Sequence, residues 1–139
     1  AFYYDAYSTA ATVHTFQWAG QRFNTGSVIT RQSTNEQVAV SEAGKYHIVV
    51  NALATLTAGA EADLFIYRYN SGDVQQEGRR SRYHNTHASA TKTMSLTYES
   101  AFAAAAGDYF MAKMSQNAGT VTPYTAATDF NDLIVTRVN

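Results

Sequence analysis

Apolar and polar residues alternate along much of this chain with the two-residue period of β-strands. The longest such run covers residues 46–56, where every second position is apolar or aromatic: Tyr46, Ile48, Val50, Ala52, Ala54 and Leu56. Val49 and Leu53 add apolar side chains on the opposite side of the same run. A strand with apolar residues on both sides is typical of a central strand that is covered on both faces.

Shorter strands are predicted around this one, separated by turn-forming residues at intervals of about ten residues. An aromatic-rich stretch over residues 2–18, followed by turn formers over residues 19–26, predicts two short strands around a turn. Further strands are predicted over residues 28–29, 38–40, 63–70, 93–98, 109–114 and 133–138. This spacing indicates an all-β sandwich or jelly roll.

Two segments do not follow the alternation clearly. Residues 74–91 are polar and predict either a long loop or an edge strand followed by a loop. Residues 101–106 favour a helix by composition, but so short a helix is unstable by itself, so they are predicted to form a connection.

The length of 139 residues suits one domain, and no linker or internal repeat divides the chain. The absence of cysteine excludes disulfides, thiolate metal ligands and cysteine nucleophiles. The formal net charge is −1, so overall charge does not point to nucleic acid or to an anionic membrane. We therefore expect one soluble domain over residues 1–139 that binds neither nucleic acid nor membrane.

Several short motifs occur in an order that resembles a known family. They are Ala1-Phe2, Phe23-Asn24-Thr25-Gly26, Ala43-Gly44-Lys45-Tyr46, Ala106-Gly107-Asp108-Tyr109 and Asp129-Phe130-Asn131-Asp132-Leu133-Ile134. The set resembles the jelly roll shared by tumour necrosis factor (TNF) and the globular head of complement component one, subcomponent q, in the form found in bacteriophage virion proteins. This resemblance implies a TNF-like jelly-roll β-sandwich of about ten strands that forms a homotrimer through apolar side chains of one sheet.

Large aromatic side chains are the candidates for the trimer interface, because aromatic residues dominate buried and interface area. The predicted interface residues are Phe65, Tyr67, Tyr69, Tyr109 and Phe130. The three rings at positions 65, 67 and 69 have an alternative role as a platform on which a carbohydrate stacks.

The richest polar cluster lies within residues 79–87. An arginine guanidinium can bind two oxygens of a carboxylate or a phosphate at once, and a tyrosine ring can stack on a ligand. This cluster is therefore predicted to contact an acidic partner protein, a phosphate or a glycan. The predicted partner-binding residues are Arg79, Arg80, Arg82, Tyr83, His84 and His87. The alternative is a solvated loop, and the fold is expected not to depend on the three arginines.

No metal, cofactor or enzymatic activity is predicted. His84 and His87 would hold a metal only with help from a third group such as Asp73 or Glu77. Asp129 and Asp132 are expected to cap a turn. The sequence contains no recognisable nucleophile motif and no phosphate-binding glycine loop.

These observations predict a capsid decoration (cement) protein, a homotrimer that binds the major capsid protein and stabilises a phage head. Its expected location is the capsid surface of the virion. The size of the chain and its lack of cysteine and of a collagen-like stalk favour this function. The alternative is the receptor- or glycan-binding tip of a phage tail or head fibre, which is extracellular and needs an upstream shaft.

Overall fold

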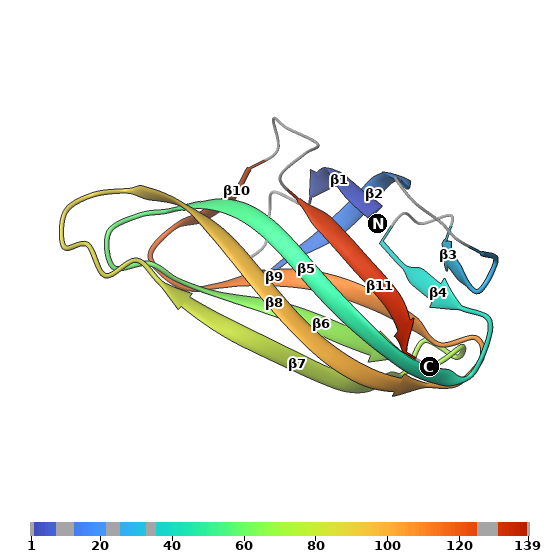
Figure 1. Cartoon of the computed structure of the whole chain (residues 1–139). Helices are drawn as coiled ribbons and strands as arrows, with labels where there is room; N and C mark the ends of the chain where they lie inside the picture. Colours follow the sequence, from blue (N-terminus) through green and yellow to red (C-terminus); the bar gives the residue numbers. More distant parts are fainter. Residues whose placement is uncertain (1, 8–12, 22–25, 33–35, 125–130, 139) are drawn as a thin grey trace.

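The computed structural model describes residues 2–7, 13–21, 26–32, 36–124 and 131–138. The described chain is all β, as predicted, and its strands form two facing layers (Figure 1). The strands are β1 (Phe2–Tyr7), β2 (Val13–Gln21), β3 (Ile29–Arg31), β4 (Val38–Val40), β5 (Gly44–Leu56), β6 (Glu61–Tyr69), β7 (Gln75–His84), β8 (Lys92–Ala104), β9 (Tyr109–Ala118), β10 (Val121–Pro123) and β11 (Asp132–Val138). No helix of the described chain is long and apolar enough to cross a membrane.

The two layers are antiparallel sheets that share one strand. Sheet A contains β1, β11, β5 and β8, with β10 paired to one end of β5. Sheet B contains β3, β4, β9, β6 and β7. Residues 13–15 of β2 pair with β9 of sheet B, and residues 16–21 pair with β1 of sheet A. Strand β2 therefore connects the sheets along one side of the sandwich, and β7 and β8 lie at the other ends of their sheets.

The core lies between the sheets and follows the alternation seen in the sequence. All even positions of β5 from Tyr46 to Leu56 are buried, as are Leu64 and Ile66 on β6. Val49 and Leu53 on the odd positions of β5 are only half-buried. The prediction that this strand is covered on both faces is therefore wrong for the single chain, because its odd side chains point away from the other sheet.

Several strand boundaries differ from the sequence prediction, and β10 was not predicted. Residues 101–104 belong to β8 and do not form a connection, because β5 is long enough to pair with β8 as far as Ala104. Phe102 is buried in the core, which further stabilises the extended conformation. Residues 19–21 were predicted within a turn but extend β2, where Gly20 and Gln21 pair with β1. The polar segment 74–91 forms an edge strand, β7, followed by a loop, which is one of its two predicted alternatives.

The turn between β9 and β10 brings two loops into close contact. Gly119 has φ of +63°, and a Cβ atom built on it would lie 2.7 Å from Cβ and 2.8 Å from Cα of Ala60. The neighbouring Thr120 N–H donates to the Thr57 hydroxyl oxygen at 2.9 Å. Glycine is required here both by the positive φ and by the lack of space.

Candidate partner-binding site

The polar strand β7 presents its residues alternately to the outer face of sheet B and toward sheet A. Arg80 and Arg82 pair in register with Phe65 and Asp63 of β6 and lie on the outer face. Arg79 points the other way, with its guanidinium carbon 5.0 Å from the centre of the Phe102 ring. The six predicted partner-binding residues therefore do not form one patch.

Arg79 and Tyr83 connect β7 to β8 across the open side of the sandwich. The Arg79 guanidinium donates to the hydroxyl of Ser100 at 3.0 Å. It also forms an ion pair with Glu77 at 2.5 Å. The Tyr83 ring packs against the core, and its hydroxyl donates to the carbonyl of Thr97. Both side chains thus take part in holding the two sheets together.

Arg80 and Arg82 share one buried carboxylate on the outer face of sheet B. Asp63 is fully buried, and its Oδ2 accepts from Arg80 Nη1 at 2.8 Å while its Oδ1 accepts from Arg82 Nε at 2.8 Å. Arg82 also lies 3.7 Å from Glu61. The hydrogen bond from Arg82 and the positive charges of both arginines lower the pKa of Asp63 below its ordinary 3.8, although burial acts in the opposite direction.

The expectation that the fold does not depend on these arginines is therefore incomplete. That expectation left out a partner within the chain, because Asp63 provides a carboxylate that both arginines bind. The sequence places Asp63 in an apolar strand, on the same parity as Phe65 and Tyr67. Its pairing depends on the register of β6 with β7, which the sequence pattern alone does not specify.

Four of the predicted interface aromatics form a continuous ladder on the same face. Phe65 stacks on Tyr67 with ring centres 5.2 Å apart, and Tyr69 stacks on Tyr109 at 5.1 Å. Tyr67 and Tyr69 join the two pairs with a tilted contact at 6.3 Å. Because neighbouring rings cover each other, the ladder favours protein packing over a carbohydrate platform. The fifth predicted residue, Phe130, lies outside the described residues.

Cationic and small residues surround this ladder. Lys113 Nζ lies 5.4 Å and 5.9 Å from the ring centres of Tyr67 and Tyr69, and Arg80 lies 6.0 Å from that of Phe65. A Cβ atom at Gly78 would lie 2.7 Å from two carbon atoms of the Tyr67 ring, so glycine leaves room for this ring against β7.

Tyr109 closes the ladder and remains uncharged over a wide pH range. Its hydroxyl donates to Oδ1 of Asp73 at 3.0 Å. Burial, and then the hydrogen bond and negative charge of Asp73, raise the pKa of Tyr109 to about 12. The outer face of sheet B therefore combines neutral aromatic rings with the cations Arg80, Arg82 and Lys113.

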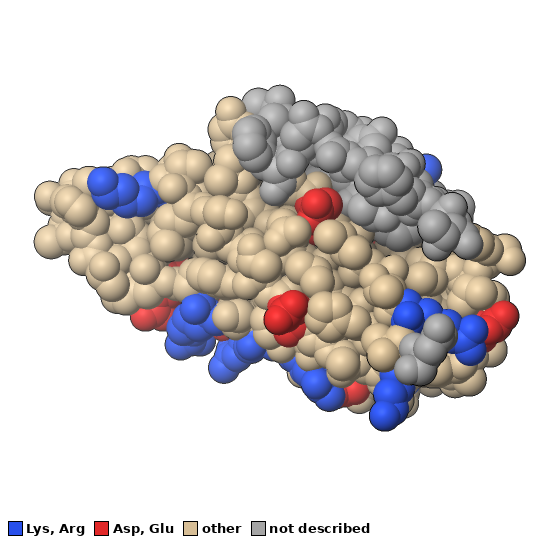
Figure 2. Space-filling view, in the orientation of Figure 1, with Lys and Arg blue, Asp and Glu red and all other residues tan. Residues whose placement is uncertain are grey.

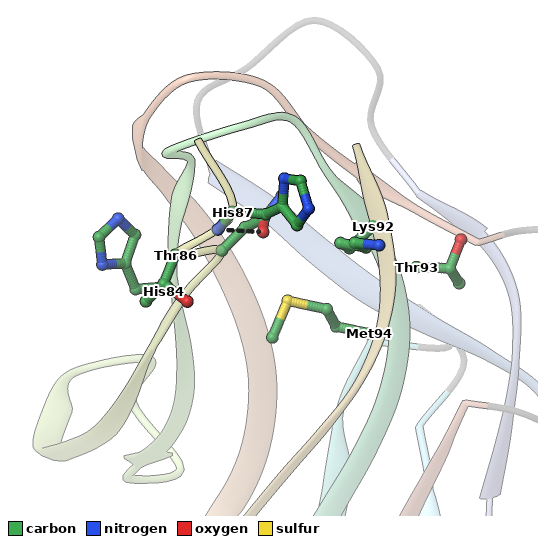
Figure 3. Close-up of a pocket in the computed structure, with 7 residues that line it drawn as sticks. His84, Thr86, His87, Lys92, Thr93 and Met94 are labelled. Carbon is green, nitrogen blue, oxygen red and sulfur yellow. Dashed lines mark hydrogen bonds between the residues drawn. The ribbon is translucent and has the colours of Figure 1, made fainter. Parts of the chain in front are cut away.

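His84 and His87 lie apart from the ladder, at a pocket beside the loop that joins β7 to β8. Both histidines line this pocket together with Lys92 and Met94. Figure 3 shows the His87 ring on the same side as Lys92 and Met94, whereas the His84 ring points away from them. Asp73 and Glu77, the carboxylates considered as further metal ligands, are engaged by Tyr109 and Arg79. Among the described residues, no group of three or more histidine, aspartate or glutamate side chains is placed to hold a metal ion.

The arrangement of the strands defines a TNF-like jelly-roll sandwich. No family model and no curated protein matches the sequence. Crystal structures of murine APRIL at pH 5.0, pH 8.0 and pH 8.5 match the fold with TM-scores of 0.71, 0.66 and 0.64 and sequence identities of 14%, 13% and 13%. Each match covers 99% of this chain and 95% of the other. The fold predicted from the ordered motifs is thereby confirmed.

Proposed function

We propose that this protein is a non-enzymatic virion structural protein, a homotrimer that decorates a phage head by binding its major capsid protein. The observation that carries this proposal is the different chemistry of the two outer faces. Sheet A presents small and aliphatic side chains with a few charges of both signs, whereas sheet B presents stacked aromatic rings with arginine and lysine. One face suits contact between identical subunits, and the other suits a different, acidic partner.

The outer face of sheet A is the proposed contact between subunits. Val49 and Leu53 on β5 and Ile134 on β11 are half-buried there, and Val49 pairs in register with Ile134. The neighbouring outward positions of β8 are small apart from Glu99, which pairs in register with Val49 and lies 3.4 Å from His47. The small ones are Thr93, Ser95, Thr97, Ala101 and Ala103. Figure 2 shows this face as mostly uncharged with isolated acidic side chains on it, and with Lys and Arg mainly along the edge where β7 runs and at the ends of the face. Subunit contact would bury this apolar area, with the charge of Glu99 kept beside His47.

Light scattering is expected to give three times the 15.2 kDa subunit mass at micromolar concentration. Ile134→Lys is expected to give the monomer mass, because it places a charge in the proposed contact. Tyr67→Lys is the matched variant on sheet B and is expected to leave the trimer intact, with circular dichroism confirming that both variants fold. A monomeric wild type would contradict the trimer. Dissociation by Tyr67→Lys alone would instead support the trimer contact predicted at Phe65, Tyr67, Tyr69 and Tyr109.

The capsid-binding face is proposed to include Arg80 and Arg82 beside the aromatic ladder. Their side chains are 56% and 50% exposed, so each keeps donors available after binding Asp63. Arginine presents five N–H donors, more than one carboxylate can accept. The remaining donors can therefore pair with carboxylate or carbonyl groups of a partner while Asp63 stays neutralised.

The double variant Arg80→Lys/Arg82→Lys is expected to reduce attachment to undecorated phage heads about tenfold or more, because lysine keeps the charge but loses the paired donors. Occupancy would be measured by cosedimentation at low and high salt, with Arg137→Lys as the control at a distant ion pair. Unchanged occupancy at both salt concentrations would remove this face from the proposal. Binding to host cells in place of heads would favour the fibre-tip alternative.

A further inference from the structure

A pocket of about 540 Å³ opens between the end of β7, the start of β8 and the loop that joins them. Its lining residues are His84, Asn85, Thr86, His87, Lys92, Thr93 and Met94 (Figure 3). The lining contains two imidazoles, an ammonium group and two hydroxyls, and it contains no carboxylate. Its volume lies in the range of small-molecule sites.

The buried side chain of Asn85 fixes the shape of this loop. Its amide nitrogen donates at 2.9 Å to the carbonyls of Leu56, Thr57 and Ala90, and its Oδ1 accepts from the backbone N–H of His87 at 3.1 Å. These bonds connect the start of the loop to the end of β5 and to Ala90 near the other end of the loop. The backbone of the loop is therefore fixed before any ligand binds.

Hydrogen bonding also determines which ring nitrogen of His87 carries the proton and can donate it to a ligand. Nδ1 accepts from the backbone N–H of Ser89 at 3.3 Å and from that of Ala90 at 3.1 Å. A nitrogen that accepts these bonds carries no proton, so the ring proton is on Nε2. In this state His87 provides an N–H donor and has no free lone pair for a metal. The hydrogen bonds of His87 thus favour an anion over a cation as the ligand of this pocket.

The charges around the pocket point to the same class of ligand. Lys92 and His84 are exposed and, in the described structure, make no ion pair with a carboxylate. The acidic residue opposite His84 in the register of β6 and β7 is Glu61, which lies 3.7 Å from Arg82. We propose that this pocket binds a small ligand through its oxyanion group, a carboxylate or a phosphate, with Lys92 and His87 as the donors. The ring of His84 points away from these two side chains (Figure 3).

This inference does not depend on the proposed capsid function, because it concerns a small molecule and a different surface. Binding would be followed by NMR of the labelled full chain at pH 6.5 and constant ionic strength, with inorganic phosphate, glucuronate and glucose as separate ligands. Phosphate, glucuronate or both are expected to shift the amide signals of residues 84–94 in a saturable manner, whereas uncharged glucose is not. The responding anion identifies whether phosphate or carboxylate is preferred.

Lys92→Met is expected to raise the dissociation constant about tenfold or more, because it removes a charged donor and keeps the length of the side chain. His87→Phe is expected to weaken binding as well, because it removes the Nε2 donor. His84→Gln, whose ring points away from Lys92, and Lys45→Met, which changes the net charge equally on sheet A, are expected to have little effect. Equal weakening by Lys45→Met, or no saturation with either anion, would overturn the proposal. Saturable binding of Zn²⁺ without binding of either anion would also overturn it.

Discussion

Replacing both Arg80 and Arg82 by alanine is expected to lower the melting temperature by about 10 °C at a fixed protein concentration. The reason is Asp63, which is fully buried and whose two oxygens bind these arginines. Without them the carboxylate must stay buried without a cation or take up a proton, and either change destabilises the folded chain.

Thermal unfolding of three variants separates this effect from a general loss of surface charge. Arg137→Ala removes an exposed ion pair with Glu42 and is expected to change the melting temperature little. Adding Asp63→Asn to the double variant is expected to recover part of the lost stability, because the amide carries no charge. If the double variant melts as late as Arg137→Ala, Asp63 does not depend on the arginines.

The same cluster gives the wild type a defined sensitivity to acid. The pKa of Asp63 is lower in the folded chain than the ordinary aspartate value of 3.8. Its ion pairs therefore contribute their full stability above this value, and the contribution is lost as pH falls through the lowered pKa of the folded state. The double alanine variant is expected to lack this component of the acid transition.

Gly119→Ala is expected to lower the free energy of unfolding by about 3 kcal/mol, as the sum of an unfavourable positive φ and overlap with neighbouring atoms. The added methyl group would lie 2.7 Å from Cβ of Ala60 and 3.0 Å from the Thr57 hydroxyl oxygen. Because the first contact is with a short side chain and its backbone, it is relieved only by moving the β5–β6 turn.

Gly59→Ala provides the matched control for this prediction. Gly59 has φ of +70°, close to that of Gly119, but a Cβ atom there meets nothing within 4 Å. This variant is expected to lose about 1 kcal/mol, the cost of the backbone conformation alone. Chemical denaturation of both variants gives the difference, and equal losses would mean that the contact between Gly119 and Ala60 is readily relieved.

The sequence predicts the fold well because alternation is a property of each strand by itself. The buried face of a strand can be identified from the sequence of that strand alone, as at the even positions of β5 and at Leu64 and Ile66 on β6. The ends of β8 and β2 were harder to predict, because alanine and glycine have little preference for strands and are held there by pairing with β5 and β1.

The candidate site was less predictable because it depends on contacts between strands. Six neighbouring polar residues suggested a single patch, but strand geometry separates Arg79 and Tyr83 from Arg80 and Arg82. The importance of Asp63 follows only from the register of β6 and β7. The role of Asn85 in shaping the pocket requires the loop to pack against the end of β5, which no local pattern indicates.

The passage of β2 from one sheet to the other makes the two long sides of the sandwich mechanically unequal. Along β2 the two sheets are joined by main-chain hydrogen bonds, which make this side of the sandwich stiff. Along β7 and β8 the described contacts are made by side chains, including those of Arg79 and Tyr83. Small opening motions are therefore expected to hinge about β2 and to be largest at the β7–β8 side. The pocket beside Lys92 lies at this side, so a ligand bound there would change how far the two sheets separate in these motions.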